Sequence, residues 1–343
     1  MRVGQAVSLR AHLVLVTLFL VGLSLSGCHE ETPWRGIIKI AIVAPYSGPL
    51  TADGASLLAG AWLATDDVNA AGGINGYRLD LIAADERLPS TPRDVAEDPA
   101  VVSIVGYRLS DAQTAEAVYR QAGLTWLATE PVDAAAGVYP LVATPSVVDR
   151  AVDRFLSSAT PAEAGPPIDA GKACQVAGTR DSGGVARVGT LDVVCGGDPN
   201  VVEFALGRLS SGTTLLCVAA WCDAPEVARW AGGRAFDVVV PAAVPSGSSR
   251  WKTVAARLGS AGQVAEAAAL GYDGVQLSAA AMRRAEPRDG LTRGAVSRAM
   301  VSTSYAGILG QYGPRGLISP VVEVRQREGG QSAPVLFRME DGS

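Results

Sequence analysis

A strand, a glycine-containing loop, a helix, a tight turn and a second strand follow one another between Ile37 and Glu86. Residues 37–43 are almost all apolar, which is typical of a strand in the buried middle of a parallel sheet. Gly72-Gly73 ends the helix, and Asn75-Gly76 turns the chain into the strand over residues 77–84. A loop after such a strand lies at the carboxyl edge of the sheet, where open α/β folds bind ligands. Apolar positions at helical spacing predict the side of the helix that faces the sheet: Leu58, Ala61, Trp62, Thr65 and Val68.

The same alternation of strands and helices continues along the chain and predicts an α/β protein built on parallel sheets. Turn-rich segments separate the elements, and the stretch over residues 159–171 is rich in Pro, Ala and Gly. We expect strands at 99–106, 123–129, 172–178, 191–195, 213–220 and 236–241, a crossing segment at 138–144, helices at 111–122, from 145, at 250–258 and at 264–284, and a final hairpin at 321–338.

The first residues have the pattern of a secretory leader. Arg2 and Arg10 precede an apolar run over residues 13–23 that is too short to span a bilayer comfortably, so a signal peptide over residues 1–27 is expected. Leu25-Ser26-Gly27-Cys28 resembles a bacterial lipobox, which implies a diacylated Cys28 and a tether over residues 28–36. Ordinary secretory cleavage near Gly27, which would leave Cys28 as a thiol, is the alternative. The expected location is outside the cytoplasm, lipid-anchored to the bacterial membrane at the periplasm or the cell surface.

Charge and histidine content exclude several functions. The net charge is −5 and no basic stripe is present, so nucleic acid is not an expected partner. The two histidines are His12, in the leader, and His29, beside the lipid site. A Ser-His-Asp hydrolase and a histidine-ligated zinc enzyme would therefore lack a key residue. Because no activated nucleophile, phosphate loop or metal cluster stands out, we expect no enzyme activity, no cofactor and no metal.

Four cysteines besides Cys28 have an even count, which in an oxidising compartment points to two disulfides. If the first three lie on neighbouring strands, Cys174–Cys217 and Cys195–Cys222 are the plausible pairs. A four-cysteine metal site is the alternative, although the spacing of Cys217 and Cys222 is marginal for it.

Three sequence motifs resemble a known family. Ser47-Gly48-Pro49, Gly54 and residues 69–76 (NAAGGING) look like the opening of the leucine/isoleucine/valine-type periplasmic binding proteins, the solute receptors of branched-chain amino-acid ABC importers. Residues 269–275 (ALGYDGV) resemble that family's "GYDAV" helix. The resemblance implies a type I periplasmic binding protein fold, with two Rossmann-like parallel-sheet lobes joined by a hinge of crossing strands. It also implies a monomer that works with ABC permease subunits.

The resemblance divides the chain into two lobes. Residues 37–142 and 247–315 would form the N-terminal lobe, and residues 143–246 and 316–343 the C-terminal lobe. In the family a full helix with a ligand-packing tyrosine follows the first strand of the second lobe. Here only the stretch TRDSGGVARVGT occupies that place, which predicts a shortened second lobe.

Ser110 aligns with the family serine that holds the amino-acid carboxylate. A helix start attracts an anion, which supports this role, but Ser110 and Gln113 also form a capping box, and both roles are compatible. Arg108 could clamp a carboxylate or point to solvent. Thr129 and Glu130 follow a strand where the family places residues near the ligand's ammonium group. Glu130 could instead pair with Arg108.

Asp53 aligns where an aromatic residue usually packs on the ligand, and an Asx turn before Gly54 is its alternative role. Tyr46 and Trp221 are the aromatic candidates from opposite lobes, with core packing as the alternative. The family's acid for the ligand ammonium group is missing, because residues 241–245 read PAAVP. Either Glu130 or Asp53 supplies that charge, or the solute is an amide, an organic acid or another small polar metabolite rather than a branched-chain amino acid.

Two functions remain open. One is a lipid-anchored solute receptor of an ABC importer. The other is a degenerate binding protein that serves as a ligand sensor or structural lipoprotein without a role in transport, which the missing acid and the shortened second lobe favour.

Overall fold

A computed structural model describes residues 34–106, 112–159, 184–188, 191–195, 199–208, 214–218, 221–222, 224–232, 234–285, 291–328 and 331–340. The chain divides into a unit of Met1–Arg35 and a compact unit of Gly36–Ser343, and the second unit contains the helices and strands named here. Cys28, Arg108, Ser110, Cys174 and the strand expected at 172–178 lie outside the described residues.

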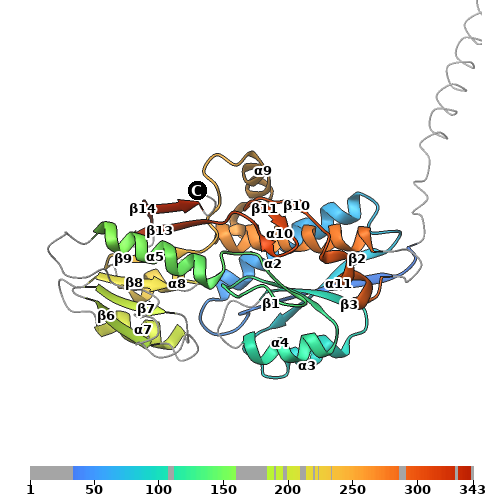
Figure 1. Cartoon of the computed structure of the whole chain (residues 1–343), viewed down its shortest axis with the longest axis horizontal. Coiled ribbons are helices and arrows are strands. Elements are labelled where there is room, and N and C mark those ends of the chain that lie inside the picture. Colours follow the sequence, from blue (N-terminus) through green and yellow to red (C-terminus); the bar gives the residue numbers. More distant parts are fainter. Residues whose placement is uncertain are drawn as a thin grey trace, which may run out of the picture. The chain divides into compact units, whose positions relative to one another are not determined.

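The first sheet has five parallel strands in the order β2-β1-β3-β4-β5 (Figure 1). The expected parallel α/β arrangement of this half is therefore confirmed. Because the strands run in one direction, their carboxyl ends lie along one edge, where the loops that carry the candidate site begin. The strands are β1 Ile37–Ala44, β2 Arg78–Asp85, β3 Val101–Gly106, β4 Thr125–Ala128 and β5 Val138–Pro140.

Helices cover both faces of this sheet, and we call the sheet with these helices the first lobe. Residues of α2 (Thr51–Ala70) and α10 (Ala265–Arg284) share one apolar cluster with β1, while α3 (Thr91–Glu97) and α4 (Ala112–Gln121) cover the other face (Figure 1). The predicted side of α2 is wrong at one position, because Trp62 is 43% exposed. Ala61, Thr65 and Val68 are buried as predicted. Leu57 and Ala64 face the core with them, since α10 packs against that side of α2.

The close approach of α2 and α10 requires glycine. A Cβ at Gly60 would overlap the carbonyl oxygen of Ala268, and a Cβ at Gly271 would overlap that of Leu57. Gly271 belongs to the ALGYDGV motif, so the motif's first glycine has a packing role in this fold.

The aspartate of that motif holds a distant loop. The Asp273 carboxylate is fully buried and accepts hydrogen bonds from the backbone N–H groups of Ile308 and Leu309 and from the Tyr312 hydroxyl. Burial raises the pKa of Asp273 to about 6, although these hydrogen bonds favour the charged form. The aspartate thereby anchors the segment that forms a small sheet of β10 (Tyr305–Ala306), β11 (Gln311–Gly313) and β12 (Gly316–Leu317).

Arg293, at the start of α11 (Arg293–Met300), ties this helix to the first sheet. Its guanidinium donates to four backbone carbonyl oxygens, at distances of 2.6 to 3.3 Å from the nitrogens. These acceptors are Val101 at the start of β3, Ala96 and Asp98 at the end of α3, and Ala122 just after α4. One side chain therefore satisfies carbonyl groups that the ends of two helices leave open.

The second sheet is mixed, in the order β14-β13-β9-β8-β7-β6, and we call it and its helices the second lobe. Only β7, β8 and β9 are parallel to one another, while β6, β13 and β14 pair in the antiparallel sense. Helix α5 covers one face, and α7 and α8 cover the other (Figure 1). The elements are α5 Pro145–Ala159, β6 Gly184–Val188, β7 Leu191–Cys195, α7 Pro199–Arg208, β8 Thr214–Val218, α8 Pro225–Trp230, β9 Phe236–Val240, β13 Val321–Glu328 and β14 Gln331–Glu340.

Three segments cross between the lobes and hydrogen-bond to one another. They run from β5 to α5, from β9 to α9 (Ser249–Leu258), and from β12 to β13. The Ala143 N–H donates to the Pro241 carbonyl, and the Ala243 N–H donates to the Val321 carbonyl, both at 2.9 Å. The crossing segment expected at 138–144 is thus present, and three adjacent crossings make the connection that the sequence predicts as a hinge.

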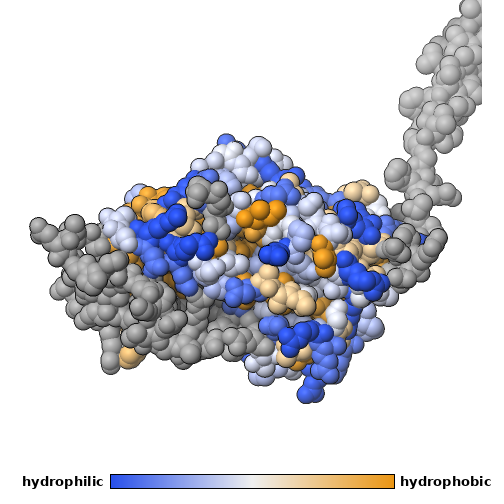
Figure 2. Space-filling model, viewed as in Figure 1, coloured by the Kyte–Doolittle hydropathy of each residue, from blue (hydrophilic) through white to orange (hydrophobic). Residues whose placement is uncertain are grey.

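Polar residues cover most of the described surface on the face shown in Figure 2, and apolar residues form separate patches there. Among the helices that the structure describes, none combines the length and apolar composition needed to cross a bilayer.

Candidate functional site

The loop after β1 begins at the carboxyl edge of the first sheet and carries Tyr46. The Tyr46 hydroxyl donates to the Ile42 carbonyl at 3.2 Å, and its backbone N–H points at Asp85 Oδ1 at 3.4 Å. Burial, with the charges of Glu86 and Asp85, raises the pKa of Tyr46, so the phenol is neutral at physiological pH. Its ring packs on the first lobe's cluster, so the core-packing role predicted as an alternative for Tyr46 is present.

The same loop leads into α2, whose first turn holds Asp53. The Asp53 side chain is fully buried, and the backbone N–H groups of Asp53 and Gly54 donate to the Leu50 carbonyl. Gly54 is required here because a Cβ would overlap the Pro45 carbonyl oxygen. The family's glycine at this place therefore lets the loop fold back on the start of α2.

Thr129 and Glu130 follow β4 at the same sheet edge. Thr129 is fully buried, and its backbone N–H donates to the Gly106 carbonyl at the end of β3 at 3.1 Å. Glu130 comes next and is partly exposed. Both residues therefore lie beside the place where the chain leaves β3 toward Arg108 and Ser110. Their ligand role stays a prediction.

Trp221, from the second lobe, is only 2% exposed and belongs to that lobe's apolar cluster. Of its two predicted roles, core packing is the one that this burial fits. The cluster also contains Leu50 from the first lobe, which the sequence did not single out.

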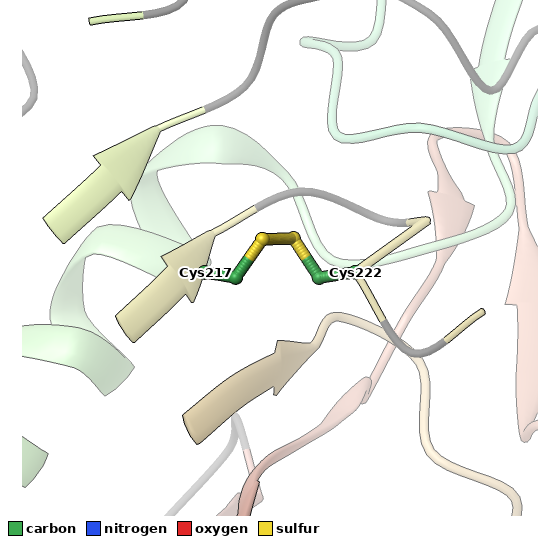
Figure 3. The surroundings of a disulfide bond; sticks show 2 residues. All are labelled: Cys217 and Cys222. Atoms are coloured by element: carbon green, nitrogen blue, oxygen red, sulfur yellow. A yellow bond between two sulfur atoms is a disulfide. The ribbon is translucent and has the colours of Figure 1, made fainter. Parts of the chain in front are cut away.

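The disulfide in this region differs from the predicted pairs. Cys217, on β8, is bonded to Cys222, and the Cα atoms are 5.8 Å apart (Figure 3). The predicted partners Cys174–Cys217 and Cys195–Cys222 are therefore wrong. Cys217 therefore pairs with a cysteine five residues further along the chain rather than with one on a neighbouring strand. Both cysteines are fully buried, and the bond closes the loop that carries Trp221.

The segment after β9 has no acid, and Ala242 and Ala243 in it are buried. The second lobe does place a carboxylate against the start of α2, from α8. The Glu226 side chain is 7% exposed, and its Oε1 lies 3.3 Å from the Ala52 backbone nitrogen and 3.5 Å from Arg229 Nη2. The sequence signal for this residue was the Pro225-Glu226 pair that opens a helix just after Trp221.

No group of three or more His, Cys, Asp or Glu side chains in the described ranges is arranged to hold a metal ion. The four-cysteine alternative loses two of its members to the Cys217–Cys222 bond.

Comparison with known proteins supports this architecture. The profile of the periplasmic binding protein family matches residues 37–152. The isoleucine complex of the branched-chain amino acid transporter substrate-binding protein LivJ from Streptococcus pneumoniae superposes with a TM-score of 0.64 at 18% identity, over 89% of this chain and 99% of that one. The chain has the type I periplasmic binding protein fold. The family resemblance and the fold class predicted from the sequence are thereby confirmed.

Two more solved structures resemble the chain. A solute-binding protein from R. palustris in complex with 4-hydroxybenzoate gives a TM-score of 0.63 at 15% identity, over 90% of this chain and 98% of that one. A fatty acid ABC transporter substrate-binding protein from Thermomonospora curvata gives 0.65 at 12% identity, over 90% and 93%. An amino acid binding protein from Pseudomonas aeruginosa is 31% identical over 93 residues, a quarter of this chain and a quarter of that protein's length.

Proposed function

We propose that this chain is an extracytoplasmic, lipid-anchored solute-binding receptor of an ABC importer. The observation that carries the proposal is the pair of sheets joined by three hydrogen-bonded crossings. The first turn of α2, just after the SGP loop of the first lobe, also contacts α8 of the second lobe. Such lobes capture a ligand by hinge closure. We place the first lobe at residues 37–142 and 247–315 and the second at 143–246 and 316–343.

The proposed site lies between the carboxyl edges of the two sheets. Ser110, Arg108, Thr129 and Glu130 would contact the solute from the first lobe, together with Tyr46 and Asp53 from the loop after β1 and Trp221 from the second lobe. Because residues 241–245 offer no acid for an ammonium group, we favour an amide, an organic acid or another small polar solute over a branched-chain amino acid. The relatives support such breadth, since one is bound to isoleucine and another to 4-hydroxybenzoate.

A diacyl group on Cys28 would hold the receptor at the membrane, at the periplasm or the cell surface, where it would deliver solute to ABC permease subunits as a monomer. The lipobox-like sequence at residues 25–28 and the short tether that follows the leader support this placement.

A second candidate function is a degenerate binding protein that acts as a sensor or structural lipoprotein. One observation favours it. Trp221, expected at the cleft wall, is buried in the second lobe's cluster, and Leu50 from the first lobe is fully buried in the same cluster.

Thermal unfolding of the mature chain without Cys28, across amino acids, amides, carboxylates and polyamines, separates the two functions. A solute that binds only the folded state stabilises it by about 2.7 kcal/mol at a hundredfold excess over the dissociation constant. Ser110→Ala should lose this shift. Ser248→Ala is the matched control, because Ser248 also caps a helix, accepting from the Trp251 N–H at 3.2 Å, and has no proposed solute contact. If no compound raises the midpoint, the degenerate function gains support.

A further inference from the structure

Leu50 has a backbone conformation that leucine rarely adopts. Its φ is 72° and its ψ is 18°, in the left-handed region, immediately before α2. The other non-glycine residue with positive φ in the described ranges is Asn75, a residue type that tolerates this region. A bulky side chain in this conformation is strained and persists only where the surroundings fix it.

The surroundings that fix Leu50 belong to the other lobe. Its side chain is fully buried, and the other members of its apolar cluster all lie between Val202 and Val321. The strained residue therefore sits where the first lobe inserts into the core of the second. Separation of the lobes would expose this side chain and remove the contacts that hold its backbone.

A polar contact lies two residues further along the chain. The Ala52 backbone N–H, at the start of α2, faces Glu226 Oε1 on α8 at 3.3 Å. Glu226 is 6% exposed, and a carboxylate at a helix start is favoured by the free N–H groups and the helix dipole. Leu50 and Ala52 thus bind the second lobe through one apolar and one charged contact.

The lobes also face one another between α8 and α10. A cavity of about 400 Å³ lies between α8 and the start of α10, lined among others by Pro225, Phe236, Val264 and Arg327. On its margin Glu266, from α10, forms an ion pair with Arg325 of β13 at 2.8 Å. The apolar cluster around Leu50 also contains Ala243 and Val321, so the Leu50 contact adjoins the crossings between the lobes.

We propose that the contacts of Leu50 and Glu226 form an inter-lobe latch, and that the strained Leu50 backbone opposes it. Burial of the Leu50 side chain and the Glu226–Ala52 hydrogen bond stabilise the closed arrangement, whereas relief of the left-handed conformation favours opening. The latch does not depend on the identity of a solute. Its consequence for affinity rests on the proposed function, because a protein that is closed for a larger fraction of time binds its solute more tightly.

The test uses the mature chain without added solute. Small-angle X-ray scattering measures the radius of gyration, and amide hydrogen exchange measures opening at residues 50–56. Leu50→Ala and Glu226→Met should both increase the radius of gyration and speed exchange at the start of α2 at least about tenfold. Glu226→Gln keeps an acceptor for the Ala52 N–H but removes the charge, so its effect on both measurements should be smaller than that of Glu226→Met.

Two further variants separate a latch from general destabilisation. Leu58→Ala, on the same helix but packed on the first lobe's cluster, should leave the radius of gyration unchanged. Leu50→Gly should open the lobes as Leu50→Ala does but unfold at a higher temperature, because glycine adopts the left-handed region freely. An unchanged radius of gyration and unchanged exchange in Leu50→Ala and in Glu226→Met would overturn the proposal. Neither readout needs a solute, so this outcome is distinct from a failure of the proposed function.

Discussion

The Cys217–Cys222 disulfide offers a sharp test of the second lobe, because it replaces the pairing expected from the sequence. The two cysteines are five residues apart and fully buried, and the bond fixes the loop after β8 that carries Trp221. The double variant Cys217→Ala/Cys222→Ala removes the crosslink while leaving small apolar side chains in the core.

The size of the effect follows from the loop length. For a closed loop of about six residues, the chain-entropy relation gives a stabilisation of about 2 kcal/mol at 25 °C. For a chain of this size, that energy corresponds to a fall of about 3 °C in the midpoint of unfolding. Removal of two buried sulfur atoms adds to the loss, so the double variant should be somewhat less stable than the parent protein after reduction.

Two measurements check this. Peptide mapping without reduction should recover a single crosslinked fragment that contains both Cys217 and Cys222, and urea unfolding should show the loss of about 2 kcal/mol with an unchanged slope. Recovery of a fragment that links Cys217 or Cys222 to Cys174 or Cys195 would refute the description of this loop. A loss several times larger than 2 kcal/mol would refute the entropic argument.

Three other substitutions test particular parts of the fold. Burial raises the pKa of Asp237 to about 6, and among the described residues its Oδ1 has no hydrogen-bond partner. Folding must keep this carboxyl protonated at pH values where the unfolded chain ionises it, so the advantage of Asp237→Asn in urea unfolding should grow from pH 4 to pH 6, to at most about 3 kcal/mol. A gain independent of pH would contradict this. Gly271→Ala should cost about 1–3 kcal/mol in thermal unfolding because its Cβ pushes α2 and α10 apart. Gly207→Ala, in α7, should be neutral or stabilising, because no described atom would lie within 4 Å of the new Cβ. Similar effects at both glycines would argue against the close helix contact. Arg293→Lys should lower the free energy of unfolding by about 2 kcal/mol, because an ammonium cannot reach the four carbonyl groups that the guanidinium binds. A free energy of unfolding equal to that of the parent protein would show that these hydrogen bonds contribute little.

Much of the first lobe could be predicted from the sequence because its signals are local. An apolar run predicts a buried parallel strand, and β1 spans Ile37–Ala44 as expected. The glycine and asparagine turn after α2 is also read directly from residue type, and Asn75 has the positive φ that this turn needs. The helices α3, α7, α8 and α11 were not predicted, since each has only six to ten residues and carries little periodic signal.

The remaining features depend on contacts between distant parts of the chain. Trp62 lies at helical spacing with core residues but is exposed, because α10 packs on a neighbouring side of α2. An even number of cysteines indicates disulfides but not which sulfur atoms meet. The left-handed Leu50 carries no local signal, since leucine disfavours that conformation and only the second lobe's cluster fixes it. Glu226 was missed because the family comparison directs attention to the segment after β9, whereas this acid lies on α8.

Calorimetric titration tests the central claim, capture of a small polar solute between the two lobes, most directly. The mature chain without Cys28 is titrated with pools of amides, organic acids and amino acids, and the active pool is then resolved into single compounds. We expect saturable heat from one compound class, with one molecule bound per chain. Ser110→Ala should weaken this binding, and Ser248→Ala should not. Absence of saturable heat from every pool, with a folded and disulfide-bonded protein, would contradict the claim.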